Sequence, residues 1–275
     1  MRFGLDVTPQ RLPWDEVVRR VKLAEDLGFD GVWGFDHFQP MYGDGPGEVF
    51  EAMTYLAAIA GLTSRIRLGV LVAGMTYRHP SVYAAQCLTI DHVSHGRLEM
   101  TFGAAWFDKE HDELGIPFPS TSERFDLLED SLEIATRLFT GDVVDYEGKR
   151  VSLQHAQLQP QPVQRPHPPI WIGGSGPKRT LPLVAKYADV WHSFGTPNSM
   201  REAYERIDQL AEKEGRDPTS ILRAGSISLD DIETSRKHAG KWRDAGYGYL
   251  VCGWPGAGDK HVEAFAREVM PDFTS

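Results

Sequence analysis

Short apolar runs rich in β-branched residues alternate with longer amphipathic segments along almost the whole chain. The short runs are typical of buried strands, whereas apolar residues that recur every three to four positions indicate helices. Residues 123–139 carry the clearest helical pattern, because Phe125, Leu128 and Leu132 fall on one face. The pattern predicts strands at residues 3–7, 31–35, 66–73, 98–102, 170–172, 190–194, 224–229 and 249–253. It predicts helices at residues 13–27, 50–62, 80–93, 123–139, 199–214, 231–245 and 261–269, and one more that ends at residue 187.

These elements make eight strands and eight helices in alternation. Two strands joined by a helix lie parallel, and eight such units close into a barrel. Residues 142–169 interrupt the alternation with a short hairpin and a proline-rich connector, residues 159–169. We therefore predict an α/β fold: a (β/α)8 TIM barrel with an insertion between the fourth and fifth units, and a single domain over residues 1–275.

Composition and charge exclude several classes of protein. The chain has 275 residues, of which 41% are hydrophobic and 25% are charged, as in ordinary globular proteins. Its net charge is −10 and it has no basic run, so we expect neither nucleic acid nor a membrane surface as a partner. No apolar run approaches the roughly 20 residues that span a bilayer. The N-terminus does not resemble a secretory signal, and Cys87 and Cys252 have no CxxC spacing. We expect a cytoplasmic protein.

Residues 34–40, GFDHFQP, carry an acid and a histidine directly after a run that should be buried. On its own, such a pair is most often a turn. In a barrel of this kind, however, the reacting groups sit at the C-terminal ends of the strands, where Asp36 and His37 fall. Histidine titrates near neutral pH and is suited to proton transfer. Because neighbours on a regular strand point to opposite sides, we expect His37 to act on the substrate and Asp36 to hold the cofactor or the loop.

Small residues end the third and fourth strands: Gly74 on one, and Gly103, Ala104 and Ala105 on the other. Residues without a large side chain let a flat ligand approach the backbone. The alternative is close packing of a helix on a strand. Two such ends opposite a strand that bears a histidine favour a planar ligand.

The fifth strand runs into GGSGPKR, residues 173–179. A glycine-rich turn before a helix presents free backbone N–H groups and the positive end of the helix dipole, which suits a phosphate. Gly173, Gly174, Ser175 and Gly176 would form the turn, and Lys178 and Arg179 would add positive charge. The alternative is a flexible turn whose charges are solvated.

Metal and hydrolase chemistry have little support in the sequence. No HExxH spacing occurs, and Glu110 and His111 are adjacent, so on a helix they point to different faces and chelate poorly. We expect no metal. The nucleophile motif G-x-S-x-G is absent, since GGSGP ends in proline.

Five segments in order carry a resemblance to a known family: VWGFDHFQP, LGVLVAGMTYRHP, GRLEMTFGAAWFDKEHDELGIPFP, ERFDLLEDSLEIATRLFTG and PPIWIGGSGPKRTLPLVAKYADVWH. Together they resemble the bacterial luciferase-like superfamily, and within it the branch predicted to use the deazaflavin coenzyme F-420. The resemblance runs from residue 2 to about residue 195. It implies a luciferase-like barrel with a deazaflavin or flavin in its C-terminal mouth. It also implies an oxidoreductase that transfers hydride and a homodimer.

The resemblance also implies roles for individual residues. His37 matches the active-site histidine of deazaflavin-dependent sugar-phosphate dehydrogenases, and Asp36 matches an acid that hydrogen-bonds the ring system or its side chain. Leu71 and Val72 match a non-prolyl cis peptide against the back of the ring. The turn at residues 173–176, with Arg179, matches the phosphate site. The remaining cofactor-binding residues on this reading are Gly74, Gly103, Ala104, Ala105 and Trp106.

Two departures from those dehydrogenases bear on the substrate. Trp106 stands in place of their catalytic glutamate, and Met41 in place of a tryptophan. The cationic residues that hold a sugar phosphate are not recognisable. We therefore expect a small organic substrate, apolar or aromatic, in a pocket formed by Trp33, Met41 and Trp106.

Three alternatives for the function stay open at this stage. An FMN-dependent monooxygenase would use the same planar site and phosphate turn. A flavin- or deazaflavin-binding protein without turnover would keep the turn and lose the catalytic acid. A non-redox barrel enzyme, such as a phosphate-ester lyase, would also need the turn. For assembly, surplus apolar residues on helices 50–62 and 80–93 predict a symmetric homodimer, unless the loop at residues 39–49 covers them.

Overall fold

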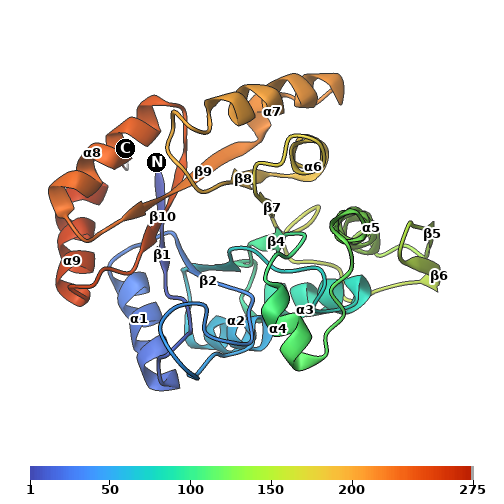
Figure 1. The fold of residues 1–275 in the computed structure, drawn as a ribbon, viewed down its shortest axis with the longest axis horizontal. Coiled ribbons are helices and arrows are strands. Elements are labelled where there is room, and N and C mark those ends of the chain that lie inside the picture. Colours follow the sequence, from blue (N-terminus) through green and yellow to red (C-terminus); the bar gives the residue numbers. More distant parts are fainter. Residues whose placement is uncertain (274–275) are drawn as a thin grey trace.

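The computed structural model of the chain describes residues 1–273 and shows strands surrounded by helices (Figure 1). The strands of the main sheet are β1 (Arg2–Asp6), β2 (Gly31–Gly34), β3 (Arg67–Val70), β4 (Met100–Phe102), β7 (Ile170–Gly173), β8 (Val190–His192), β9 (Leu222–Ser228) and β10 (Tyr249–Gly253). The helices are α1 (Trp14–Asp26), α2 (Ala52–Leu62), α3 (Pro80–Val93), α4 (Asp108–Leu114), α5 (Thr121–Leu138), α6 (Thr180–Tyr187), α7 (Arg201–Lys213), α8 (Ile232–Asp244) and α9 (Asp259–Ala264). A hairpin, β5 (Val144–Glu147) and β6 (Ser152–Ala156), lies outside the main sheet.

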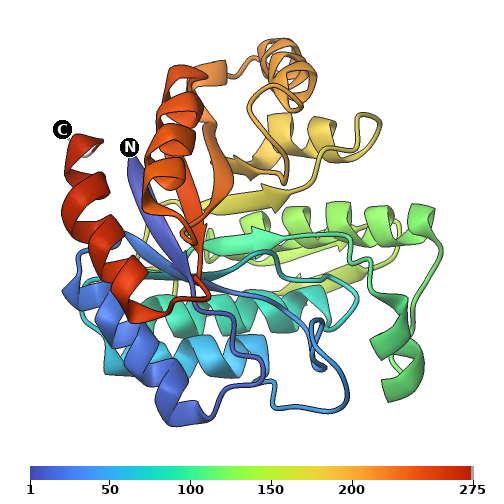
Figure 2. The ribbon, with the colours of Figure 1, turned by 60° about the vertical axis from the view of Figure 1, so that its left-hand side comes forward.

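The eight strands of the main sheet are all parallel and follow the order β3-β2-β1-β10-β9-β8-β7-β4. The two edge strands meet through single bridges, which pair Leu68 with Leu98 and Gly74 with Gly103. The Gly103 N–H donates to the Ala73 carbonyl at 2.8 Å. These contacts bring the sheet close to a full ring, and the predicted barrel is confirmed. Figure 2 shows the strands in the middle of the molecule with helices outside them.

Aromatic side chains fill the interior of the barrel. The rings of Trp33 and Trp171 lie 4.3 Å apart, and the Trp33 indole N–H donates to the hydroxyl of Tyr249 at 3.1 Å. Glycines make the space for this cluster. A Cβ at Gly4 would lie 2.3 Å from Trp33 Nε1, and one at Gly69 would lie 2.6 Å from Trp33 Cζ3. The interior is therefore a packed core, and room for ligands is left at the mouth.

The segment between β4 and α5 contains a helix, α4, that we did not predict. This helix falls in a stretch that we predicted to be a loop, since DKEHDEL has no apolar periodicity. Its buried positions are polar: Glu110 and His111 are both fully buried. A pattern of hydrophobic residues cannot reveal a helix whose inner face is made of an acid and a histidine.

The hairpin β5–β6 lies beside α5, on the side away from the barrel (Figure 1). One buried carboxylate on α5 ties it down. Asp130 accepts hydrogen bonds from the Tyr146 hydroxyl at 2.8 Å and from the N–H groups of Lys149 at 3.1 Å, Arg150 at 2.6 Å and Val151 at 3.0 Å. The Asp130 side chain thus anchors the hairpin by accepting hydrogen bonds from the N–H groups of its turn. The hairpin does not reach the mouth of the barrel.

Several bounds differ from the prediction. The third strand ends at Val70 instead of residue 73, and the peptide bond between Leu71 and Val72 is cis, as the family resemblance implied. The helix predicted at residues 123–139 is α5, which begins at Thr121, and Ser120 and Glu123 form a capping box at its start. No helix within residues 1–273 is both long and apolar enough to cross a membrane.

Candidate active site

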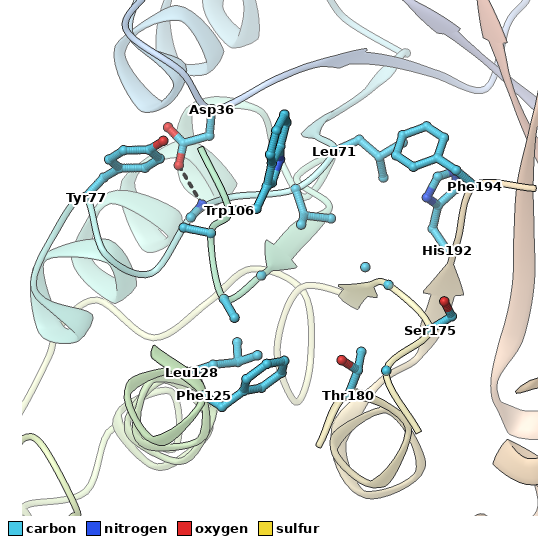
Figure 3. Close-up of a pocket in the computed structure, with 18 of the residues that line it drawn as sticks. Asp36, Leu71, Tyr77, Trp106, Phe125, Leu128, Ser175, Thr180, His192 and Phe194 are labelled. Carbon is cyan, nitrogen blue, oxygen red and sulfur yellow. Dashed lines mark hydrogen bonds between the residues drawn. The ribbon is translucent and has the colours of Figure 1, made fainter. Parts of the chain in front are cut away.

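A cavity of about 550 Å³ opens at the C-terminal mouth of the barrel. Figure 3 shows Asp36, Tyr77 and Trp106 on one side of it and Phe125 and Leu128 of α5 on another. Twelve of the thirteen residues predicted to bind a cofactor line this cavity: Asp36, Leu71, Val72, Gly74, Gly103, Ala104, Ala105, Trp106, Gly173, Gly174, Ser175 and Gly176. The other lining residues are His37, Tyr77, Phe125, Leu128, Thr180, His192 and Phe194.

The glycine-rich turn between β7 and α6 forms one end of the cavity. Gly174 has a φ of +108°, a conformation that favours glycine. Its N–H donates to the carbonyl of His192 at 2.9 Å. Within residues 1–273, the N–H groups of Ser175 and Gly176 donate to no acceptor. The turn therefore leaves backbone donors free beside the N-terminus of α6, and these can receive an anionic group.

Arg179 does not lie where we predicted it. It is absent from the residues that line the cavity, and its guanidinium donates to Asp126 on α5 at 2.7 Å. Glu129 is also near, at 3.7 Å, and the guanidinium lies over the ring of Phe125. The carboxylates of α5 attract the guanidinium away from the turn, which leaves the backbone donors and the exposed Lys178 as its positive groups.

The small residues at the strand ends accommodate side chains of the protein itself. A Cβ at Gly74 would lie 2.6 Å from the ring of Tyr77, and one at Gly103 would lie 2.6 Å from Val72 Cγ2. A Cβ at Gly173 would come within 3.1 Å of the same valine. Packing thus explains these glycines, but the neighbours belong to the loop between β3 and α3 and not to a helix, as the alternative had supposed. Val72 is seated on Gly103 and Gly173 and forms part of the cavity wall.

Asp36 is buried and holds the loop that follows β3. Its carboxylate accepts hydrogen bonds from the Gly74 N–H at 2.8 Å (Figure 3) and from both terminal nitrogens of Arg78, at 2.6 and 2.9 Å. Arg78 also pairs with Glu51 at 2.8 Å. Asp36 and His37 nevertheless line the same cavity, because β2 ends at Gly34 and the chain beyond it leaves strand geometry.

His37 is bound by a buried carboxylate that we did not predict. Its Nδ1 lies 2.6 Å from Oε1 of Glu110 on α4. The other oxygen of Glu110 accepts the Phe38 N–H at 2.9 Å, and the Tyr77 hydroxyl also donates to Glu110. Burial raises the pKa of Glu110, but these hydrogen bonds outweigh it and the pKa lies below its ordinary value. An ionised carboxylate only accepts, so His37 Nδ1 carries the proton and Nε2 is left for a reactant.

Aromatic residues surround this network. The ring of His37 has edge contacts with Phe35, Trp106 and Phe107 at centroid distances of 5.1 to 6.2 Å. Burial and the bond to Glu110 raise the pKa of Tyr77 well above its ordinary value, so its hydroxyl stays a donor. These surroundings hold the imidazole in one orientation.

His192 lies on the opposite side of the cavity, at the end of β8 (Figure 3). Its Nε2 is 2.9 Å from the hydroxyl of Ser226, and burial lowers the pKa of His192 to about 4. It is therefore neutral at neutral pH. Residues 1–273 contain no group of three or more His, Cys, Asp or Glu side chains that could hold a metal ion.

A second cavity of about 370 Å³ adjoins the first. Four residues line both cavities: His37, Leu71, Trp106 and Phe194. The three residues predicted to contact the substrate, Trp33, Met41 and Trp106, all line the second cavity. The indole of Trp33 belongs mostly to the barrel core and reaches this cavity at its base.

Some residues of the site that we did not predict could have been found from the sequence, and others could not. His192 and Phe194 end a strand that we predicted, so the rule that strand ends carry ligands could have found them. Glu110, Tyr77 and Arg78 could not be found in this way, because they act through partners that are 27 to 73 positions away.

The fold and the site together define a TIM-barrel protein with a ligand cavity at its mouth. A sequence model described as luciferase-like monooxygenase matches residues 1–251, and the chain belongs to this bacterial luciferase-like family.

Curated relatives include proteins named for coenzyme F-420. The chain is 34% identical over 181 residues to the F-420-dependent glucose-6-phosphate dehydrogenase of Microbacterium testaceum. The aligned region covers 66% of this chain and 53% of the relative. It is 31% identical over 259 residues to the 5,10-methylenetetrahydromethanopterin reductase of Archaeoglobus fulgidus. The aligned region covers 93% of this chain and 71% of the relative. The chain spans about half the length of the glucose-6-phosphate dehydrogenases that it matches.

Solved structures share the fold. An F-420-dependent secondary alcohol dehydrogenase in complex with an F-420–acetone adduct superposes with a TM-score of 0.88 at 19% identity, over 98% of both chains. The coenzyme F-420-dependent tetrahydromethanopterin reductase from Methanopyrus kandleri gives 0.84 at 20% identity, over 99% of both chains. A type II Baeyer–Villiger monooxygenase from Pseudomonas putida in complex with FMN gives 0.75 at 15% identity, over 99% of both chains. At these identities the likeness bears on the fold alone.

Proposed function

We propose that the protein is an F-420-dependent oxidoreductase that exchanges a hydride between the deazaflavin and a small organic substrate. The observation that carries this proposal is the cavity itself, which extends from free backbone donors at the glycine turn to a histidine held by a buried carboxylate. The relatives of Microbacterium testaceum and Archaeoglobus fulgidus support the choice of reaction, because the first is named as F-420-dependent and both are named as redox enzymes.

The residues present fit such a cofactor. The volume of about 550 Å³ lies within the range of about 300 to 1,000 Å³ that is usual for ligand pockets. The N–H groups of Ser175 and Gly176 would receive the phosphate, and the wall at Val72 would support a planar ring. When bound, the deazaflavin supplies a ring carbon that gives or accepts a hydride.

The protein itself would handle the proton. Glu110 keeps the proton of His37 on Nδ1, so Nε2 can take a proton from the substrate or, once protonated, return it. Glu110 does not line the cavity and is a positioning residue. This arrangement matches the general logic of a base that is oriented by a buried acid.

FMN is the alternative cofactor. It has a planar ring and a phosphate, so the same turn and wall would hold it, and the family description names monooxygenases. An FMN enzyme could activate oxygen, which a deazaflavin does poorly.

A binding titration separates these proposals. We expect F-420 to bind at least tenfold more tightly than FMN when cofactor fluorescence is followed as the protein is added, about 1.4 kcal/mol. Equal or tighter binding of FMN would replace the deazaflavin assignment by a flavin one. If neither cofactor binds, the proposed function is wrong.

A further inference from the structure

We infer that the second cavity is the substrate chamber, and that Asp6 at its base selects an uncharged substrate with a hydroxyl group and rejects anions. This inference rests on the proposed function, since it takes the larger cavity as the cofactor site. It adds a residue and a substrate class that the cofactor site does not determine.

The position of the chamber comes from the strands that form it. It lies over the ends of β1, β2, β9 and β10, whereas the larger cavity lies over the ends of β2, β3, β4, β7 and β8. The two are in contact at His37 and Trp106, which line both. A molecule in the chamber would therefore have His37 on the side that faces the larger cavity. Figure 3 shows Trp106, Leu71 and Phe194, which are shared by both cavities, on the side opposite Phe125 and Thr180.

The walls of the chamber are mostly apolar or aromatic. They include Trp33, Phe35, Met41, Tyr42, Ile227 and Val251. Neither lysine nor arginine is among the described residues that line it, and Asp6 is its one carboxylate. A phosphate or carboxylate entering the chamber would meet the carboxyl group of Asp6 and neither lysine nor arginine, in a protein with a net charge of −10.

One carboxylate oxygen of Asp6 has no hydrogen-bond donor among the described residues. Its Oδ1 accepts both the N–H of Thr8, at 2.9 Å, and the hydroxyl of Thr8. Oδ2 has no partner within residues 1–273. Burial raises the pKa of Asp6 further than the bonds from Thr8 lower it. The carboxyl group is therefore short of a donor, and a hydroxyl group on a ligand would supply one.

The two serine hydroxyl groups of the chamber are already engaged. The Ser226 hydroxyl lies 2.9 Å from His192 Nε2, and the Ser228 hydroxyl donates to Asp230 at 2.7 Å. Asp6 Oδ2 is thus the open carboxylate oxygen of a mostly apolar chamber, whose other open polar groups are Nε2 of His37 and the hydroxyl of the exposed Tyr42. A compact apolar molecule with one hydroxyl group matches this distribution.

Three probes of nearly equal shape test the inference: benzyl alcohol, benzyl methyl ether and benzoate. Their dissociation constants would be measured by ligand-observed NMR on the full chain, with and without saturating F-420. For ligands this small we expect constants of about 1 mM for the alcohol. We expect the ether, which lacks the donor, and benzoate, which is anionic, to bind at least tenfold more weakly.

Variants assign the selectivity to Asp6. Asp6→Ala should abolish the preference for the alcohol over the ether. Asp6→Asn keeps the shape and removes the charge, so it should improve binding of benzoate relative to the native chain even if Asp6→Ala fails to fold. Asp142→Ala, at an exposed aspartate beside the hairpin, is the matched control and should leave the order of the three probes unchanged. Equal binding of alcohol, ether and benzoate, or no binding of the alcohol, would overturn the inference.

The same samples separate the two proposals. If F-420 binds and the probes are not discriminated, the assignment of the chamber is wrong and the proposed function stands. If F-420 fails to bind and the alcohol is still preferred through Asp6, the chamber stands as a binding site and the proposed function is wrong.

Discussion

His37 has its role set by its neighbours more than by its own position in the sequence. Glu110 and the surrounding aromatic rings fix the imidazole, and its free nitrogen remains on the cavity side. Buried networks of this kind act as a unit, so each member should affect the rate without forming or breaking a bond to the cofactor.

Replacing His37 with alanine should lower turnover by a factor of about 100 to 10,000, the usual contribution of a positioned acid or base. Cofactor affinity should change by only a few-fold, because the phosphate turn lies at the other end of the cavity. Steady-state kinetics with a confirmed substrate and a parallel F-420 titration measure both quantities. An unchanged rate would mean that the acid–histidine pair is only a turn.

Glu110→Gln should lower turnover by about 10- to 100-fold, a part of what the histidine supplies. Its effect on stability should depend on pH. The folded-state pKa of Glu110 lies below its ordinary value of 4.5, so the carboxylate contributes stability above about pH 4.5 and loses it as pH falls through the folded pKa. Urea denaturation should show a gap between the native chain and the variant that is constant near neutral pH and shrinks below pH 4.5. A gap that is independent of pH would contradict the network.

Asp36 and Arg78 form a buried ion pair, and removing one partner should cost more than removing both. Asp36→Ala leaves the guanidinium with Glu51 alone, and should destabilise the fold by about 3 kcal/mol. Asp36→Leu combined with Arg78→Met should cost less, because Glu51, the one carboxylate that then loses its cation, is 31% exposed and still accepts the N–H groups of Met53 and Thr54. Denaturant unfolding of both variants checks this, and a double variant that is the less stable of the two would refute the argument. Of the two roles expected for Asp36, its hydrogen bonds are to the loop after β3.

At the scale of elements, the turn from β7 to α6 determines where an anion can bind. With Arg179 paired to α5, the turn depends on its backbone donors, and its affinity for phosphate should respond to charge placed beside them.

Ser175→Glu should weaken F-420 binding by tenfold or more, about 1.4 kcal/mol, because a carboxylate would repel the phosphate. Ser175→Gln is the matched control of similar size and should change binding by no more than a few-fold. Gly174 is a poorer target, since its φ of +108° would strain any other residue. Equal losses for Glu and Gln would mean that the turn does not bind an anion.

The whole molecule has one face that we predict to be an interface. A groove of about 510 Å³ runs between α2 and α3, and beside it Val82, Leu62 and Val93 are 52%, 46% and 43% exposed. Most other apolar residues of these helices, such as Met53 and Tyr83, are buried within the chain, so the surplus is smaller than the sequence suggested.

We still predict a symmetric homodimer through this face. Light scattering at micromolar concentration should give twice the chain mass, and Val82→Arg should give the mass of one chain. Val143→Arg is the control, because Val143 is 58% exposed and lies at the hairpin. If the native protein has the mass of one chain, this face is not a dimer interface.

The barrel and its mouth could be predicted from sequence because both follow from local patterns. Alternating strands and helices specify the ring, and the position of His37 at a strand end follows from it. The network around His37 could not be predicted, since Glu110 lies in a helix without an apolar face. Arg179 was misplaced for a related reason: its pairing with Asp126 depends on where α5 lies, and no local pattern reports that.

The aromatic filling of the barrel has a consequence for ligand traffic. Trp33, Trp171 and Tyr249 pack across the interior, so the barrel is open to ligands at its mouth and is not a channel. Cofactor, substrate and product must all pass through the same rim, where Trp106 is 66% exposed between the two cavities. The occupant of the larger cavity then becomes one wall of the smaller. Binding would therefore follow an order, in which the larger ligand enters first and leaves last.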